Sequence, residues 1–245
     1  MYLSTLLIDV GVNPDRPRPG RLWLRNPYHV HQRLCMAFPS PSRKSDDPDF
    51  LKPFEPQDFG HQQVHVARRT DAGFLFRIDP QPAGRVVILV QSAVKPDWDY
   101  AFHNAGYLLA GPPEWRSFDP CFAQGQLLRF RLVANPTRKI DTKSGPDGRR
   151  RNGKRVPVAT EQLYQWLGGR AGPAGFSIDR DSTTVQPGYV YVNRTPDGNG
   201  HRLRSVRYDG ILKISDPIRF QETLVCGIGP AKAFGFGLLS LARAD

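Results

Sequence analysis

Tyr28 and His31 are the two side chains whose types and spacing best suit proton transfer in this sequence. They lie in the segment Tyr28-His29-Val30-His31-Gln32, directly after Asn26-Pro27, which is typical of a helix start with Asn as the N-cap. Residues three apart share one face of a helix, so Tyr28 and His31 should point the same way and His29 another way. Imidazole titrates near neutral pH, and a phenol can orient a phosphate or a ribose hydroxyl. The pair therefore suits acid–base chemistry on a phosphodiester.

Cleavage of RNA by its own ribose needs little more than such a pair. The 2′-OH attacks the neighbouring phosphate, a base takes the 2′ proton, and an acid protonates the leaving 5′ oxygen. The products are a 2′,3′-cyclic phosphate and a 5′-OH, and a cation or N–H cluster stabilises the charge on phosphorus. This chemistry requires no metal. A solvated histidine on a surface helix is the alternative interpretation.

A glycine-rich run near the C-terminus leads from Gly227 directly into an apolar segment that ends near residue 241. Gly227, Gly229 and Gly235 leave the loop without side chains, so a phosphate or RNA strand can approach backbone N–H groups with Lys232 beside them. The competing interpretation is a bent terminal strand that needs glycines to pack. Both interpretations stay open at this point.

The chain is strongly basic, with 34 Lys and Arg against 23 Asp and Glu and a formal net charge of +11. Of these basic residues 26 are Arg, whose planar fork suits phosphates, base edges and aromatic faces. A GC-rich genome would explain the preference for Arg over Lys, but not the excess over acids. The composition favours a nucleic-acid partner.

Two groups of arginines are the expected nucleic-acid contacts. The first belongs to a basic stretch near residues 137–155 and comprises Arg149, Arg150, Arg151 and Arg155. The second lies on or beside a predicted hairpin over residues 189–214 and comprises Arg194, Arg202 and Arg204. Residues two apart on a strand project from one face, and an arginine-bearing hairpin can enter or clamp an A-form stem. A solvated sheet face is the alternative.

The sequence offers little for metals, disulfides or membranes. His61 and His65 lack a neighbouring carboxylate pattern, and the scattered acids form no recognisable metal-binding set, so no metal or cofactor is expected. The three cysteines are far apart, which fits a reducing cytoplasm better than a disulfide framework. No apolar stretch approaches the roughly 20 residues that span a bilayer, and the N-terminus lacks signal-peptide features. We therefore expect a cytoplasmic protein without a membrane partner.

The elements that must position these residues follow the same order twice. In the first half we predict strands over 1–9, 74–78, 86–91 and 126–134, a helix over 28–37, a second helix near 98–110, and an irregular loop over 11–22. In the second half we predict strands over 156–158, 188–193, 203–214 and 238–242, with helices over 160–167 and 217–226. Each half is therefore β-α-β-β-α-β. This order predicts an α+β fold of two tandem ferredoxin-like domains, 1–136 and 155–245, joined by a basic linker over 137–154.

The sequence resembles the CRISPR repeat-processing endoribonucleases of the type I-E CasE kind. The matching segments cover most of the chain: Tyr28 to Leu34, Leu89 to Ser92, Pro96-Asp97-Trp98, Phe130 to Pro136, Lys154 to Pro157, Tyr208 to Leu212, and the run from Gly227 to Leu241. The last of these matches is the family's glycine-rich signature and is highly specific. The resemblance implies two ferredoxin-like domains and metal-independent cleavage at the 3′ base of a repeat stem-loop. It also implies that the protein stays bound to the product as a subunit of the interference (Cascade) complex.

The resemblance also implies roles for single residues. His31 would be the catalytic histidine and Tyr28 its partner, and Lys232 with the glycines around it would contact RNA. Some members carry a lysine five residues after the histidine, where this chain has Met36, so Arg33 or another arginine would have to supply positive charge near the RNA.

Two other functions are the alternatives to a repeat-processing endoribonuclease. A non-catalytic subunit that only caps a guide RNA is the second hypothesis. A DNA-binding or metal-dependent nuclease is the third, and the missing acidic cluster argues against it.

Overall fold

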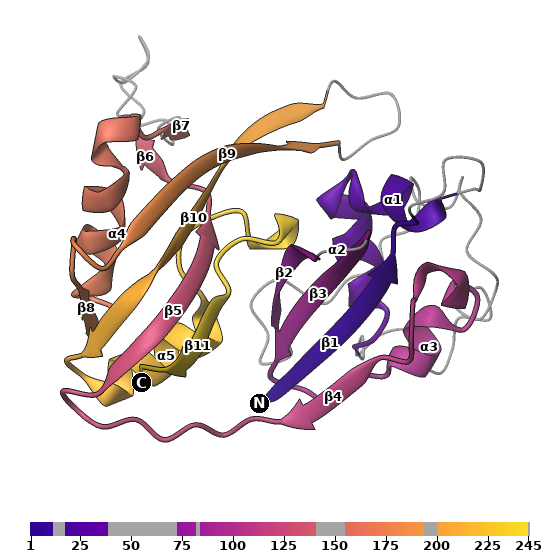
Figure 1. Ribbon diagram of the computed structural model, residues 1–245, viewed down its shortest axis with the longest axis horizontal. Helices are drawn as coiled ribbons and strands as arrows, with labels where there is room; N and C mark the ends of the chain where they lie inside the picture. The colour runs from indigo at the N-terminus through magenta and orange to yellow at the C-terminus, as the bar shows by residue number, and fades with distance from the viewer. Residues whose placement is uncertain (12–17, 39–72, 82–83, 141–154, 194–199, 245) are drawn as a thin grey trace, which may run out of the picture. The chain divides into compact units, whose positions relative to one another are not determined.

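The computed structural model describes residues 1–11, 18–38, 73–81, 84–140, 155–193 and 200–244 (Figure 1). The chain forms two compact units. Unit 1 consists of residues 1–121, 191–202 and 232–238, and unit 2 consists of residues 122–190, 203–231 and 239–245. Each unit is therefore assembled from segments that are far apart in the sequence.

Unit 1 is built on an antiparallel sheet with the strand order β2-β3-β1-β4. The strands are β1 (Tyr2–Asp9), β2 (Phe74–Gln81), β3 (Arg85–Ser92) and β4 (Glu114–Ser117). Helices α1 (Pro19–Leu24) and α2 (Pro27–Cys35) come between β1 and β2 in the chain. Helix α3 (Trp98–Phe102) and the 3₁₀ turn η3 (Gly106–Leu108) come between β3 and β4. This order is the β-α-β-β-α-β plan of a ferredoxin-like domain.

The core of unit 1 follows from alternation along the strands and from one stripe of α2. Leu6 and Ile8 on β1 are fully buried, because side chains two apart on a strand share a face. Val30 and Leu34, four apart on α2, are fully buried in the same cluster. Burying one such side chain contributes about 1.5–3 kcal/mol. This contact fixes the rotation of α2 about its own axis.

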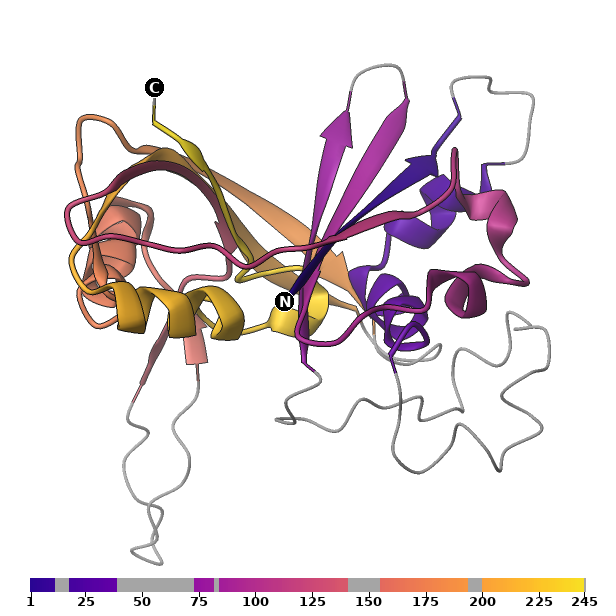
Figure 2. The same ribbon diagram turned by 90° about the horizontal axis from the view of Figure 1, so that it is seen from below.

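Unit 2 repeats the plan with the strand order β11-β5-β10-β8. The strands are β5 (Leu127–Ala134), β8 (Phe176–Ile178), β10 (His201–Ile214) and β11 (Leu239–Arg243). Helices α4 (Leu163–Ala171), preceded by the turn η4 (Thr160–Gln162), and α5 (Pro217–Cys226) lie on one face of this sheet (Figure 2). Strand β9 (Thr184–Val192) pairs with β10 as a hairpin outside the four-strand order.

The predicted α+β class with two ferredoxin-like domains is confirmed, but several elements differ from the prediction. The predicted strand over 126–134 is β5. It belongs to the second sheet, where it lies between β11 and β10 and pairs with both. The last strand of the first sheet is instead β4, which the sequence analysis did not predict. The division into units therefore falls at residue 121, earlier than the expected boundary at 136.

Two smaller segments also differ. The short strand expected near 156–158 is β7 (Arg155–Pro157), and it pairs with β6 (Thr137–Lys139) in a separate two-stranded sheet. Most of the expected linker, residues 141–154, lies outside the described residues. The loop expected over 11–22 contains the start of α1, because Pro19 fits the first turn of a helix and Trp23 buries its indole.

Candidate active site

Helix α2 begins at a well-formed N-cap. The Asn26 side chain accepts a hydrogen bond from the backbone N–H of Tyr28 (3.2 Å), and Pro27 occupies the first turn. Asn26 also donates from Nδ2 to the backbone carbonyl of Asn193 (2.7 Å), and the Asn193 N–H donates to Asn26 Oδ1 (3.2 Å). Residues 191–202 belong to unit 1, so the cap is fixed by a segment far along the chain. This arrangement holds the first turn of α2, where Tyr28 lies.

Tyr28 and His31 lie close together on α2, as the three-residue spacing predicts. Their ring centroids are 6.4 Å apart, and both side chains are partly exposed. His29 is also partly buried, and burial lowers the pKa of its imidazole. The helix therefore presents one tyrosine and one histidine together.

Aromatic rings and a thiol surround His31. Its ring lies 5.4 Å from Phe74 and 6.2 Å from Phe76 between centroids, and it is nearly parallel to Phe76 (14°). The buried Cys35, one turn further along α2, places its Sγ 3.6 Å from Nε2 of His31. None of these three neighbours was predicted from the sequence. The four-residue spacing of His31 and Cys35 and the alternation of Phe74 and Phe76 are the signals that could have found them.

The C-terminal part of the glycine-rich run packs against this helix. The 3₁₀ turn η5 (Lys232–Phe234) contacts α2 and β2 (Figure 1, yellow). The ring of Phe234 lies 6.1 Å from that of Tyr28. Gly235 has φ +81°, and a Cβ there would stand 3.2 Å from Cε2 of Phe76. The run was assigned to the second domain, but residues 232–238 belong to unit 1 together with Tyr28 and His31.

The earlier glycines of the run have structural roles in unit 2. Gly227 ends α5 with φ +72° and donates its N–H to the Thr223 carbonyl (2.7 Å). Gly229 has φ +85°, and a Cβ would stand 3.1 Å from the Trp166 ring. Ala231 also has a positive φ of 66°. These positive φ values supply the packing explanation for the glycines, and an RNA contact by their backbone stays a proposal.

The arginines predicted to contact RNA fall into three groups: those held by hydrogen bonds within the protein, those exposed to solvent, and those outside the described residues. Arg33 is only 3% exposed and donates from Nη1 to the Ala101 carbonyl (3.1 Å) and to Asn104 Oδ1 (2.9 Å), so it fastens α2 to the α3 region and is not presented to RNA. Its burial lowers the pKa of the guanidinium to about 10. Arg204 donates to the Val158 carbonyl (2.9 Å) and to Thr160 Oγ1 (2.6 Å).

Arg155 and Arg202 are exposed. Arg155 also donates a hydrogen bond to Thr137 Oγ1 (3.3 Å). The remaining four predicted arginines lie outside the described residues: Arg149, Arg150, Arg151 and Arg194. Among the predicted arginine contacts that the structure describes, Arg155 and Arg202 are therefore the exposed ones, and they stay proposed RNA contacts.

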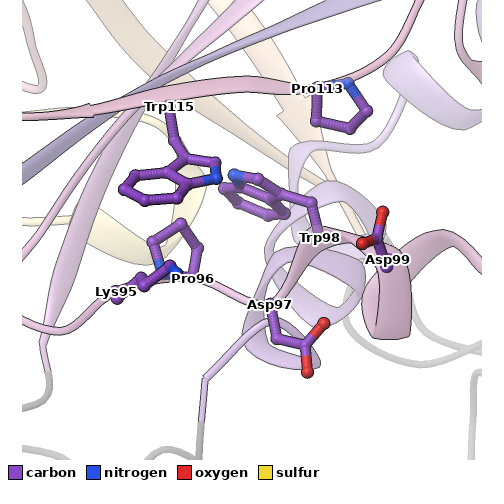
Figure 3. Close-up of a pocket in the computed structure, with 7 residues that line it drawn as sticks. All are labelled: Lys95, Pro96, Asp97, Trp98, Asp99, Pro113 and Trp115. Atoms are coloured by element: carbon purple, nitrogen blue, oxygen red, sulfur yellow. The ribbon is translucent and has the colours of Figure 1, made fainter.

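A pocket of ≈ 440 Å³ in unit 1 is formed by residues other than this pair (Figure 3). Trp98 and Trp115 line it with Pro96, and the Lys95 ammonium lies 4.3 Å from the centroid of the Trp115 ring.

In the described part of the chain, no group of three or more His, Cys, Asp or Glu could hold a metal ion. The same part contains no helix long and apolar enough to cross a membrane.

Comparisons with known proteins agree with this architecture. The chain is 30% identical to the CRISPR-associated endoribonuclease Cse3 of Thermus thermophilus, over 99% of this chain and 100% of the relative. It is 29% identical to the CRISPR system Cascade subunit CasE of Escherichia coli, over 99% of each chain. A structure of CRISPR endoribonuclease Cse3 bound to a 19-nucleotide RNA matches with a TM-score of 0.71 and 28% identity, covering 99% of this chain and 100% of that one.

The fold and these relatives define an endoribonuclease built from two ferredoxin-like domains. A sequence model of a family described as CRISPR associated protein matches residues 1–243. The chain belongs to that family, within its type I-E CasE branch.

Proposed function

We propose that this protein binds the stem-loop of CRISPR repeat RNA and cuts precursor CRISPR RNA by internal attack of a ribose 2′-OH. The bond from O2′ to phosphorus forms while the bond from phosphorus to O5′ breaks. His31 transfers a proton, either from the 2′-OH or to the leaving 5′ oxygen, and Tyr28 orients the phosphate or the ribose. The products are a 2′,3′-cyclic phosphate and a 5′-OH.

The observation that supports this proposal is the pairing of Tyr28 and His31 on one helix, with ring centroids 6.4 Å apart. General acid–base groups and stabilisation of charge suffice for this reaction, so we propose that it proceeds without a metal. The named relatives are an endoribonuclease and a Cascade subunit, which supports repeat RNA and other subunits of a type I-E interference complex as partners. We propose that the protein stays bound to its product in that complex.

RNA binding is proposed for residues of both units. The exposed Arg155 and Arg202 suit contacts with phosphates, and the partly exposed backbone near Gly227 and Gly229 can be approached by an RNA strand. Gly235, predicted as a further contact, is buried against Phe76 and is therefore not proposed to touch RNA. Lys232 adds a positive charge within the glycine-rich run. A net charge of +11 provides the long-range attraction.

Cleavage of the protein's own repeat RNA in EDTA tests the mechanism. We expect cutting by the wild type, no cutting of a substrate with 2′-deoxyribose at the scission site, and a loss of about 10²–10⁴-fold in rate for His31→Ala with RNA binding retained. His29→Ala is the matched control on the same helix and should cut at close to the wild-type rate. Cutting of the 2′-deoxy substrate would refute the mechanism. Tight binding by the wild type without any cutting would support the guide-capping alternative.

A further inference from the structure

The proposed reaction builds negative charge on the oxygens of the scissile phosphate, and helix α2 exposes no lysine or arginine to meet it. Met36 occupies the position at which some members of the CasE family carry a lysine. Its side chain is only 1% exposed and lies within the core of unit 1. A lysine there would have to bury its ammonium or leave the core. The charge must therefore come from elsewhere in the fold.

Two buried arginines of unit 1 are already engaged. Arg33 is buried and donates to Ala101 and Asn104. Arg77 follows Phe76 on β2, is 4% exposed, and forms a two-pronged ion pair with Asp79, with N–O distances of 2.7–2.9 Å. If either guanidinium turned to a phosphate, it would break these bonds and leave the buried Ala101 carbonyl or the partly buried Asp79 carboxylate without its partner.

The turn η5 brings another cation to the helix. Its Cα atoms come within 8 Å of those of α2, and Lys232 is its first residue. Two residues later, Phe234 packs on Tyr28, and then Gly235 approaches Phe76, whose ring is nearly parallel to that of His31. Lys232 is partly exposed, and none of the ion pairs among the described residues involves it. Its backbone is therefore held beside the Tyr28–His31 pair while its ammonium can reach solvent on a flexible stem.

We propose that Lys232 supplies the positive charge that stabilises the scissile phosphate during cleavage, in place of a lysine on α2. This inference rests on the proposed function and assigns Lys232 a role in the transition state beyond ground-state RNA binding. An interaction made mainly in the transition state lowers the cleavage rate when it is removed, with a smaller effect on affinity.

Single-turnover cleavage with enzyme in excess, combined with binding of the 2′-deoxy substrate, tests this role. Lys232→Gln removes the charge while keeping a polar side chain. We expect it to lower the rate by about 10²–10³-fold, which is the range for loss of one charge-stabilising donor, and to weaken binding by less than about 10-fold. Lys232→Arg should restore most of the rate. Lys213→Gln, at an exposed lysine on β10, is the matched control and should leave the rate unchanged.

The outcomes separate the two proposals. If Lys232→Gln cleaves at the wild-type rate once RNA is bound, or if its whole defect is in binding, Lys232 is not the transition-state cation, and the His31 mechanism can still hold. If His31→Ala cleaves normally, the proposed mechanism itself fails. A low rate for Lys232→Arg as well as Lys232→Gln, with unfolding midpoints like that of the wild type, would overturn the requirement for charge, because both variants would then fail for a reason other than charge.

Discussion

The ring of Phe234 lies 6.1 Å from that of Tyr28, although the two residues are 206 positions apart in the sequence. Phe234 is 7% exposed, and Tyr28 is partly exposed on the first turn of α2. Aromatic pairs at this separation contribute about 0.5–1.5 kcal/mol beyond the area they bury. The contact joins the glycine-rich run to the helix that carries the proposed catalytic pair.

Loss of the Phe234 ring should affect cleavage more than a comparable loss elsewhere in the fold. Phe234→Leu keeps an apolar side chain and should lower the free energy of unfolding by about 1 kcal/mol. We expect its single-turnover cleavage rate to fall as well, because Tyr28 loses the ring that packs against it. Phe220→Leu is the matched control, since Phe220 is fully buried in unit 2 against Phe176 and Phe122. Equal cleavage rates for the two variants would show that the contact does not position Tyr28.

Gly235→Ala tests whether this glycine allows the run to approach the site. A side chain at φ +81° is strained, and its Cβ would press on Phe76. We expect a loss of about 1–2 kcal/mol in stability and slower cleavage, measured by denaturant unfolding and single-turnover assays. Gly168→Ala in α4 meets no atom within 4 Å and should be stabilising by about 0.5–1 kcal/mol. A Gly235→Ala protein as stable and active as the wild type would contradict the packing explanation.

Asp209 should make stability depend on pH in the acid range. Partial burial alone would raise the pKa of its carboxyl, but hydrogen bonds from Arg131 and Arg207 outweigh burial and lower it below its ordinary value of 3.8. A lowered folded pKa means that the stabilisation is present above about pH 4 and is lost as the pH falls through the folded value.

The variant Asp209→Asn should therefore lose about 1 kcal/mol near pH 7, and the gap to the wild type should shrink as the pH falls from 5 to 3. Unfolding curves at several pH values measure this gap. Asp119→Asn, at an exposed residue in unit 1, is the control. A gap that stays constant down to pH 3 would show that the Asp209 carboxylate does not stabilise the fold.

Arg202 and Arg204 should respond differently to removal despite their two-residue spacing. Arg202 is exposed, so Arg202→Ala should weaken RNA binding and lower the slope of log affinity against log salt by about 0.7–0.9, which corresponds to one phosphate contact. Arg204 is bonded to Val158 and Thr160, so Arg204→Ala should mainly lower stability. Affinity measured at several salt concentrations, together with thermal unfolding, separates the two. An unchanged salt slope for Arg202→Ala would remove it from the RNA contacts.

Local chemistry made much of this protein predictable from its sequence. The Asn26-Pro27 start of α2, the common face of Tyr28 and His31, and the Asp216 cap of α5 depend on residues within one or two turns. The α+β class with two β-α-β-β-α-β units followed from alternation and helix spacing. The basic charge and the matching motifs in the sequence indicate the family.

Only the tertiary structure decided which distant segments meet. It placed β5 in the second sheet, since strand pairing depends on partners that lie far along the chain, Val206 to Lys213 on β10 and Leu239 to Arg243 on β11. It buried Arg33, because a neighbouring region offers the carbonyl and amide oxygens that satisfy its guanidinium. It also placed Phe234 on Tyr28 and Gly235 on Phe76, because a loop with positive φ at its glycines can turn its side chains onto α2 and β2. Such contacts are set by packing between residues about 70 to 210 positions apart, and no periodicity within either segment specifies them.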